Sequence, residues 1–439
     1  MSKYYSWGRY RQVPQRIEAL DWRFHTLPEA GTAHGLLPHG QGRSYGDVCL
    51  NDDGTLLITD SLDHFIHFDR EKGLLSCESG VTLEQILQLV IPHGWFLPVT
   101  PGTRFVTLGG AIANDVHGKN HHLAGTFGQH LTKFELLRSD GSRLLCDENT
   151  NPDYFRATIG GLGLTGLVTW AELQLMPVSS PNIHKEAIKF SSLSEFEQLS
   201  SESDQDWPYT VAWLDCFSMQ RNQGRGIFFR GRHSSEAQRP QPVALDAPSL
   251  LRVPFDAPAS LLNKFTIGLF NTLYFHAHRK KSVTPAEDFR TFFYPLDGVR
   301  DWNRLYGKSG LFQFQCVIPE ENQPALTDLL ALIAKSGQGS FLSVLKKFAD
   351  RPSPGMLSFP RPGITLALDF ANRGDRTLAL LRELEKIVFA ANGAIYPAKD
   401  AIMSAESYQA FYPAWQQFSR WVDPGFSSSF WRRVSGLKV

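Results

Sequence analysis

The sequence predicts a protein of two domains that mix α-helices and β-strands, and three features of the chain lead to this prediction. Its 439 residues exceed the usual length of a single domain. Short apolar runs with strand character alternate with amphipathic helical patterns. The pattern of predicted elements changes after Pro177, where strands and helices begin to alternate, and it changes again near Gly393. We therefore expect a first domain over residues 1–178, a second over residues 179–392, and a third segment over residues 393–439.

The first region is expected to contain short strands and one clear helix. The segment TLEQILQLVIPHG, residues 82–94, predicts a helix because its apolar residues recur on one face and a glycine ends it. The turn SDGS, residues 139–142, predicts a hairpin between strands at residues 134–138 and 143–146. Further strands are predicted at residues 55–59, 74–78, 95–99 and 167–176.

The second region alternates strands with helices. Helices are predicted at residues 321–334 and 375–391. The segment 234–256 is rich in proline and polar residues, which predicts a mobile surface loop. Strands are predicted at residues 209–214, 226–229, 312–318 and 364–370.

Composition and charge narrow the classes of function. Hydrophobic residues make up 42% of the chain and charged residues 20%, as in ordinary globular proteins. The 44 basic and 44 acidic side chains cancel, which argues against a nucleic-acid partner. Five scattered cysteines without a C-x-x-C pair predict free thiols in a reducing compartment.

The sequence predicts a cytoplasmic location. The N-terminal residues lack the apolar core of a secretory signal. The longest apolar stretch, residues 261–275, is too short and too polar to span a bilayer. Because Arg279, Lys280 and Lys281 follow it, this stretch is either a peripheral contact with the inner face of the cell membrane or a partly buried helix.

Two glycine-rich loops stand out in the first region. The stretch PGTRFVTLGGAIANDVHGKNHH, residues 101–122, holds four glycines, which let main chain lie close against a ligand. It predicts either a cofactor-binding loop or a loop that only changes the direction of the chain. The loop LPHGQGRSYGD, residues 37–47, combines three glycines with Arg43 and Ser44 and suits a diphosphate. It is not a G-x-G-x-x-G motif, because Tyr45 replaces the third glycine, and it is not a P-loop.

The histidines at positions 117, 121 and 122 raise the alternative of a metal-dependent hydrolase. No H-E-x-x-H motif accompanies them, although Asp115 is adjacent. Gly118 would disrupt a helix that carries the ligands. We therefore expect no metal site here.

Four segments in this order resemble the FAD-dependent oxidases of the vanillyl-alcohol oxidase and p-cresol methylhydroxylase type: HGQGRSYGD, PGTRFVTLGGAIANDVHGKNHH, GGLGLTG and YPAKD. Within that superfamily the chain resembles the decaprenylphosphoryl-β-D-ribose 2-oxidase family. The segments TFGQH, AWLD, YPLD, WNRLYG, FQFQCVIP and SFLSVLKKF stand in the family's order and extend the resemblance over nearly the whole chain. The resemblance implies an α+β fold of two domains. An FAD-binding domain is formed by both chain ends, and a substrate domain, built on an antiparallel sheet with helices, is inserted between them.

The resemblance also implies an activity. Such an enzyme oxidises the 2-hydroxyl of a polyprenylphosphoryl-β-D-ribofuranose to the 2-keto sugar. A separate NAD(P)H-dependent keto-reductase would then complete the epimerisation to the arabinose lipid donor of the cell envelope. Two alternatives stay open: an aldonolactone or other sugar-alcohol FAD oxidase, and a catalytically silent polyprenyl-binding protein.

FAD is expected to be bound non-covalently. Covalent members of the superfamily carry a histidine in the pattern R-G-x-G-H-S, and this chain has Arg43 before Ser44 at that place. By the resemblance, the cofactor-binding residues are Gly40, Gln41, Gly42, Arg43, Ser44, Tyr45, Gly102, Thr103, Thr107, Gly109, Gly110, Asn114, Val116, His117, Gly118, Gly163, Tyr396, Ala398 and Lys399.

Lys399 in YPAKD is the first candidate for the catalytic group. By the resemblance it lies at the flavin edge, where a cation stabilises developing negative charge. From the residues alone a surface lysine in a turn is favoured, and only the resemblance reverses this preference. His117 and Tyr45 are candidate proton carriers near the same face, with a purely structural hydrogen bond as the alternative role of His117.

The substrate contacts also come from the resemblance. Alternation along a strand puts Gln313 and Gln315 on one face, which points either into a cavity or to solvent. Lys119 and Lys346 suit a phosphate on the substrate. The full set of expected substrate contacts is Lys119, Trp213, Tyr306, Gln313, Gln315 and Lys346.

Two places depart from the family pattern. Mycobacterial members carry a cysteine near the flavin where this chain reads TLALDF, with Thr365 and Ala367. His39 stands where an arginine is usual before the first loop. These departures bear on the identity of the substrate more than on FAD binding.

Overall fold

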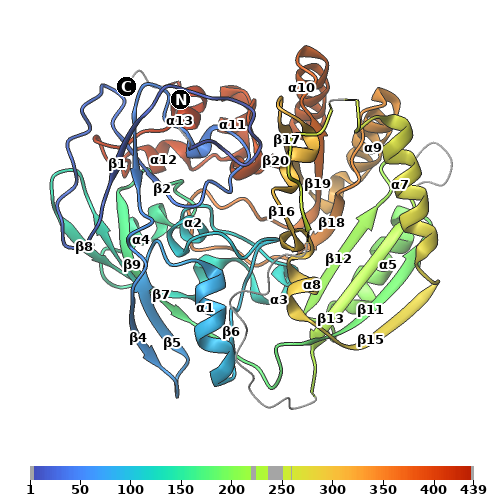
Figure 1. The fold of residues 1–439 in the computed structure, drawn as a ribbon, viewed down its shortest axis with the longest axis horizontal. Helices are drawn as coiled ribbons and strands as arrows, with labels where there is room; N and C mark the ends of the chain where they lie inside the picture. Colours follow the sequence, from blue (N-terminus) through green and yellow to red (C-terminus); the bar gives the residue numbers. More distant parts are fainter. Residues whose placement is uncertain (1–3, 219–223, 236–250, 259, 437–439) are drawn as a thin grey trace.

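Two large β-sheets with helices around them form the molecule (Figure 1). The computed structural model describes residues 4–218, 224–235, 251–258 and 260–436. In Figure 1 the two ends of the chain, blue and red, lie together, while the middle of the chain forms the opposite side. The α+β class predicted from the sequence is confirmed.

The first large sheet is antiparallel and lies in the N-terminal part of the chain. Helix α1 (Leu83–Val90) packs into the same core as this sheet. It begins with a capping box, in which the Thr82 hydroxyl accepts from the Gln85 N–H and the Gln85 amide accepts from the Thr82 N–H. The helix predicted here is confirmed, with a final 3-10 turn at Ile91–His93. The strand order is β4 (Phe65–Asp69), β5 (Leu74–Glu78), β9 (Leu167–Gln174), β7 (Leu131–Leu137) and β8 (Arg143–Cys146).

Smaller elements surround this sheet and lead into the two glycine-rich loops. A parallel three-stranded sheet has the order β1 (Arg16–Ala19), β3 (Thr55–Ile58) and β2 (Leu36–His39). Strand β2 includes the first three residues of the first loop, and α2 (Leu108–Ala113) lies within the second. The remaining elements of this part are β6 (Trp95–Phe96), paired with β10 (Met176–Pro177), and the helices α3 (His121–Ala124) and α4 (Pro152–Thr158).

The second large sheet has eight strands, and every pair in it is antiparallel. Its strands contribute buried aromatic and aliphatic residues to the largest core, together with helices and turns that pack against the sheet. The strand order is β15 (Lys281–Glu287), β11 (Ile183–Phe190), β13 (Gly226–His233), β12 (Tyr209–Leu214), β18 (Ser343–Phe348), β19 (Gly363–Ala371), β17 (Leu311–Ile318) and β20 (Ala394–Ile395).

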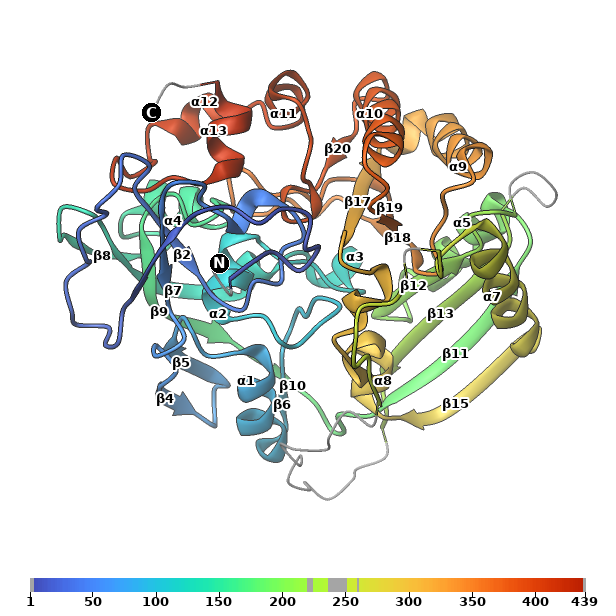
Figure 2. The ribbon, with the colours of Figure 1, turned by 45° about the horizontal axis from the view of Figure 1, so that its top comes forward.

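Helices cover both faces of the second sheet (Figure 2). Because neighbouring strand residues point to opposite faces, Ala212 packs with Phe196 of α5 (Leu193–Ser203), whereas Trp213 packs with Tyr274 of α7 (Lys264–Ala277). The other helices of this part are α8 (Phe289–Phe293), α9 (Pro324–Ser336) and α10 (Asp375–Ala390).

The predicted surface loop 234–256 is described only at its ends. Residues 236–250 lie outside the described residues. At the far end, β14 (Leu251–Arg252) pairs with β16 (Val299–Arg300) in parallel. The described part therefore includes a short strand that the sequence did not predict.

The end of the chain returns to the N-terminal part. After β20 come a 3-10 turn at Pro397–Lys399 and the helices α11 (Ala405–Phe411), α12 (Trp415–Ser419) and α13 (Ser429–Ser435). From α13, Arg433 donates to Asp47 from Nε (2.8 Å) and Nη2 (2.7 Å), and Nη2 also donates to Asp400 (2.9 Å). This clamp joins the last residue of the first glycine-rich loop to the residue that follows Lys399.

Candidate active site

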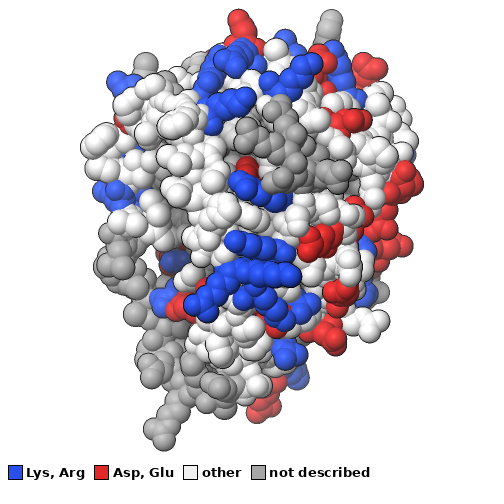
Figure 3. Space-filling model, turned by 90° about the vertical axis from the view of Figure 1, so that its right-hand side faces the viewer, with Lys and Arg blue, Asp and Glu red and all other residues white. Residues whose placement is uncertain are grey.

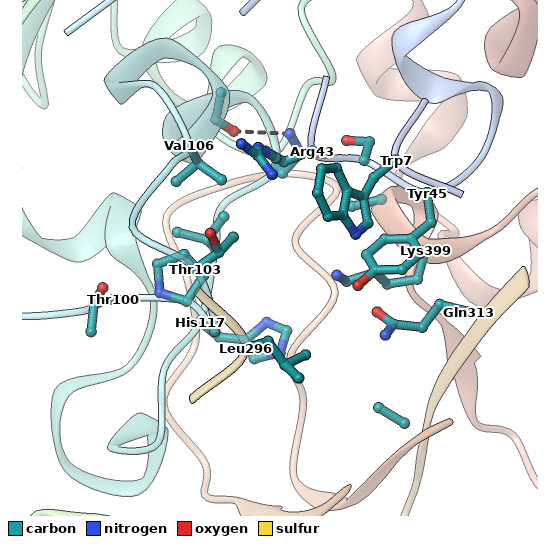
Figure 4. A pocket seen from close by; sticks show the side chains of 18 of the residues that line it. Trp7, Arg43, Tyr45, Thr100, Thr103, Val106, His117, Leu296, Gln313 and Lys399 are labelled. Atoms are coloured by element: carbon teal, nitrogen blue, oxygen red, sulfur yellow. Dashed lines mark hydrogen bonds between the residues drawn. The ribbon is translucent and has the colours of Figure 1, made fainter. Parts of the chain in front are cut away.

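A cavity of about 700 Å³ is lined by residues from both large sheets and both glycine-rich loops. Figure 4 shows Tyr45, Lys399 and Gln313 on one side of it and Thr103 and His117 on the other. The lining thus draws on residues more than 350 positions apart in the sequence, from Tyr45 to Lys399. The cavity is the site where chain ends and central sheet meet.

The first loop continues from β2, and two of its glycines lie so close to other residues of the protein that a side chain would not fit. A Cβ on Gly40 would lie 2.5 Å from Thr107 Oγ1, and a Cβ on Gly46 would lie 1.6 Å from the Asp400 carbonyl oxygen. Within the described chain, the N–H groups of residues 41–44 donate to no protein acceptor. Arg43 stacks over the Trp7 ring at 4.3 Å. The loop therefore offers unpaired N–H donors and a cation to a ligand.

The second loop holds further polar atoms without partners. Thr107 Oγ1 accepts from the Gly110 N–H at 3.1 Å and so begins α2. Among the described residues, several lining side chains carry a buried polar atom that has no hydrogen-bond partner. These atoms include Arg43 Nε, Ser79 Oγ, Asn114 Oδ1 and His117 Nδ1. Buried polar atoms are normally paired, so this wall fits a polar ligand.

His117 is 7% exposed and lies at the junction of the second loop with the large sheet. Its Nε2 accepts from Gln315 Nε2 at 3.0 Å, and the Gln315 amide also donates to Thr365 Oγ1 at 3.2 Å. Burial, followed by the nearby Lys346, holds the pKa of His117 well below its usual value. The ring is therefore neutral near pH 7, with Nδ1 left to carry the proton.

Lys399 lies at the end of a 3-10 turn whose backbone is tied to the first loop. The Tyr45 N–H donates to the Ala398 carbonyl at 2.9 Å, and Lys399 Nζ lies 4.1 Å from the centre of the Tyr45 ring. Burial lowers the pKa of Lys399 to about 8 and raises the pKa of Tyr45 well above its usual value. Tyr45 therefore keeps its proton at neutral pH.

Strands β17 and β19 present a polar stripe to the cavity. Gln313 and Asp369 are register partners, and Gln313 Nε2 donates to Asp369 Oδ1 at 2.5 Å. Gln315 lies two residues further on the same face. Burial raises the pKa of Asp369 to about 7.

Two further half-buried lysines lie in the lining. Lys119 donates to the Phe292 carbonyl and lies 4.5 Å from the centre of the Phe292 ring. Lys346 lies 5.7 Å from the centre of the Phe348 ring. Burial lowers the pKa of each to about 7, and their mutual repulsion further lowers that of Lys119. An anion between them would relieve both effects.

Most of the residues predicted from the sequence meet in this one cavity. Two do not line it: Gln41 donates instead to Asp60 at 3.1 Å, and Tyr306 is buried behind the wall against Phe341. The residues that do line it are Gly40, Gly42, Arg43, Ser44, Tyr45, Gly102, Thr103, Thr107, Gly109, Gly110, Asn114, Val116, His117, Gly118, Lys119, Gly163, Trp213, Gln313, Gln315, Lys346, Tyr396, Ala398 and Lys399.

Sequence reasoning missed several lining residues. Asp369 carries a signal, because it is the one charged residue in the apolar strand ITLALDF. Trp7 and Ser79 carry none, since each reaches the cavity only through the tertiary fold. His121 and His122 face elsewhere: His121 packs on Phe348, and His122 Nε2 contacts the Trp207 carbonyl at 3.1 Å. Within the described chain, no cluster of His, Cys, Asp and Glu is suited to a metal ion.

Comparison with known proteins adds independent information. A family model described as an FAD binding domain matches residues 29–147. Decaprenylphosphoryl-β-D-ribose oxidase of Mycolicibacterium smegmatis is 36% identical over 418 residues, which are 92% of this chain and 90% of the relative. An uncharacterized protein of Streptomyces coelicolor is 33% identical over 371 residues, 81% of this chain and all of the relative. L-gulonolactone oxidase of Mus musculus is 30% identical over 140 residues, 31% of each chain.

Proposed function

This chain belongs to the decaprenylphosphoryl-β-D-ribose oxidase family and is an FAD-dependent oxidoreductase that acts on CH–OH groups, and we propose that it oxidises the 2-hydroxyl of a polyprenylphosphoryl-β-D-ribofuranose to the 2-keto sugar. One observation carries the proposal. A single cavity joins partner-free donors of the two glycine-rich loops to three half-buried lysines, Lys119, Lys346 and Lys399. This arrangement suits an alcohol that carries a phosphate, next to a large polar cofactor.

The residues of the two loops fit FAD. The free N–H groups of residues 41–44 would receive the diphosphate, with Arg43 as its counter-ion. The unpaired Ser79 Oγ, Asn114 Oδ1 and His117 Nδ1 would meet polar atoms of the ring system. The position of the histidine in covalent members is occupied by Arg43, so the binding we propose is non-covalent.

The chemistry divides between the cofactor and the side chains. Bound FAD supplies the acceptor for the hydride that leaves the carbinol carbon. Lys399 Nζ is cationic below pH about 8 and would stabilise the negative charge that develops beside it. His117 is neutral and would orient a polar group through Nδ1, while Gln315 holds its ring. Lys119 and Lys346 would bind the phosphate.

Anaerobic mixing of the purified holoprotein with candidate substrates tests this function. We expect a polyprenylphosphoryl ribose to bleach the flavin absorbance, and free ribose or an aldonolactone not to. Bleaching by the lactone alone would favour an aldonolactone oxidase, for which the partial match to L-gulonolactone oxidase is weaker support. Absence of bleaching by every alcohol would favour a silent polyprenyl-binding protein.

The 2-keto product calls for a separate NAD(P)H-dependent reductase to complete an epimerisation.

We further propose that the lipid tail leaves the cavity beneath α7, which would lie on an anionic membrane surface. Within the described residues, no helix has the length and apolar character needed to cross a bilayer. On α7, Phe270 and Tyr274 line the cavity, while Phe265 is 77% exposed and Leu273 61% exposed. Exposed cations, Arg279, Lys280 and Lys281, follow directly. Figure 3 shows Lys and Arg side chains gathered on this side of the molecule.

Vesicle sedimentation separates this role from a nonspecific apolar contact. The double variant Phe265→Ser and Leu273→Ser, and separately Lys280→Glu with Lys281→Glu, should weaken binding to anionic vesicles by at least tenfold. The control is Phe24→Ser, which changes a side chain 60% exposed outside α7 and should leave binding unchanged. Equal loss in the control, or no loss in the α7 variants, would refute the proposed surface.

A further inference from the structure

Three acidic side chains line the cavity, and two of them are paired with cations. Glu287 binds Lys185 at 2.5 Å. Asp297 accepts from the Arg104 N–H at 2.9 Å and lies 3.6 Å from its guanidinium. Asp369 has no cation within ion-pair distance among the described residues, and its Oδ2 has no hydrogen-bond partner. It is therefore the lining carboxylate that stays available to a ligand.

Asp369 is also held in a defined orientation. It is 1% exposed, and Gln313 on the neighbouring strand donates to its Oδ1 at 2.5 Å. The charged and titratable groups that face it come from three elements: Lys399 from the turn after β20, Tyr45 from the first loop, and Tyr306 from the 3-10 turn Trp302–Tyr306. Fixing one oxygen leaves Oδ2 as the free acceptor beside Lys399 and Tyr45.

We propose that Asp369 accepts the hydroxyl proton of the substrate at Oδ2, with Gln313 as the positioning residue. The proposal rests on the proposed function and names the base that it requires. In the step, the O–H bond of the carbinol breaks and its proton joins Oδ2. The C–H hydrogen and its electron pair leave the carbinol carbon as hydride, for which FAD, when bound, would supply the acceptor. The electron pair left on oxygen completes the C=O bond, so charge and electrons balance.

The other groups near this site are less suited to take the proton. Tyr45 is protonated at neutral pH, because burial raises its pKa. Lys399 is a cation below pH about 8. His117 already accepts at Nε2 from Gln315, and burial depresses its pKa. Asp369, with a pKa raised to about 7, is a stronger base than an ordinary carboxylate and is ionised at mildly alkaline pH.

The isosteric variant Asp369→Asn tests the proposal. We expect the first-order rate of anaerobic flavin bleaching by the lipid-linked ribose to fall by about 10²- to 10⁴-fold, with FAD content and melting temperature preserved. In the parent protein this rate should rise with pH through about 7, as Asp369 ionises, and this limb should vanish in the variant. The matched control is Glu385→Gln, a buried carboxyl that bonds Ser404 away from the cavity and should change neither rate nor profile.

A second variant and a spectroscopic measurement keep the test independent of activity. Because the Gln313 hydrogen bond favours the ionised carboxylate, Gln313→Leu should move the rising limb to higher pH. Infrared difference spectra of the resting holoprotein should contain a carboxyl band that titrates near pH 7 and is absent in Asp369→Asn. An unchanged bleaching rate in Asp369→Asn, or a carboxyl already ionised at pH 5, would overturn the inference. Failure of the parent protein to be bleached would instead overturn the proposed function and leave the infrared result standing.

Discussion

At the scale of single residues, the site is marked by buried or half-buried ionisable side chains that form no ion pair among the described residues. Lys119 and Lys346 have pKa values lowered to about 7 by burial, and Asp369 has one raised to about 7. Such groups cost folding free energy in the absence of a ligand. Their presence in one cavity is therefore better explained by binding and catalysis than by stability.

Replacing Lys399 should affect the chemical step more than binding of the cofactor. We expect Lys399→Met to lower the rate of flavin bleaching by about 10²- to 10³-fold, because a preorganised cation next to developing negative charge is lost. Lys399→Arg should recover part of the rate. Stopped-flow absorbance measures both, and Lys386→Met, which alters a lysine 70% exposed on α10, is the control. A Lys399→Met enzyme with unchanged rate would exclude this role.

The two phosphate-site lysines predict a pH dependence of stability. In the folded protein their pKa is about 7, against 10.5 for an ordinary lysine, so above pH 7 the unfolded chain holds more protons. Stability without substrate should therefore rise from pH 7 toward pH 10, by up to about 1.4 kcal/mol per pH unit for each lysine. Denaturant unfolding at pH 7 and pH 9 measures this rise. Lys119→Met combined with Lys346→Met should flatten it, and Lys386→Met should not.

At the scale of elements, close backbone contacts bring the two ends of the chain together. The first loop, the turn that carries Lys399 and helix α13 meet at Gly46, where the backbone approaches Asp400. Arg433 then bridges Asp47 and Asp400. These contacts fix the position of the first loop relative to Lys399.

Removing the Arg433 clamp should destabilise the protein and weaken its hold on FAD. Arg433→Leu leaves two buried carboxylates without their shared partner, and we expect a loss of about 3–5 kcal/mol in unfolding free energy. Chemical denaturation and the flavin content of the purified protein measure these effects. Arg420→Leu, at an exposed arginine of the same segment, serves as the control. Equal stability of the two variants would show that the clamp is dispensable.

At the scale of the whole molecule, the cavity lies where the two large sheets and the chain ends meet. We propose that residues 1–178 and 393–439 form one FAD-binding domain and residues 179–392 the substrate domain. Strand β20 belongs to the last segment in sequence but pairs with β17 of the large sheet. The segment after Gly393 therefore contacts both halves, which places Lys399 at their junction.

A ligand that contacts both chain ends should stabilise the whole fold. We expect removal of FAD to lower the melting temperature, and added FAD to restore it in a concentration-dependent way. At a free FAD concentration one hundred times its dissociation constant, binding should add about 2.7 kcal/mol to the free energy of unfolding. Thermal unfolding monitored by circular dichroism checks this expectation. A melting temperature that does not depend on FAD concentration would argue against a cofactor that spans the two ends.

The sequence alone determined the features that depend on local patterns. Helix α1, the SDGS hairpin and the two glycine-rich loops could each be predicted because neighbouring residues specify them. Most of the residues assigned by the resemblance line the cavity, including Lys399 and the Gln313 and Gln315 pair. These residues have recognisable motifs around them.

Only the tertiary structure decided the relations between distant residues. Gln41 turns to Asp60 and Tyr306 lies behind the wall, although both stand in motifs that predicted contact with a ligand. The Arg433 clamp joins residues 386 positions apart, and Asp369 gains its role from burial and from Gln313 on another strand. Burial and missing counter-ions are properties of the packed fold, and they raise or lower a pKa in a way that no local pattern encodes.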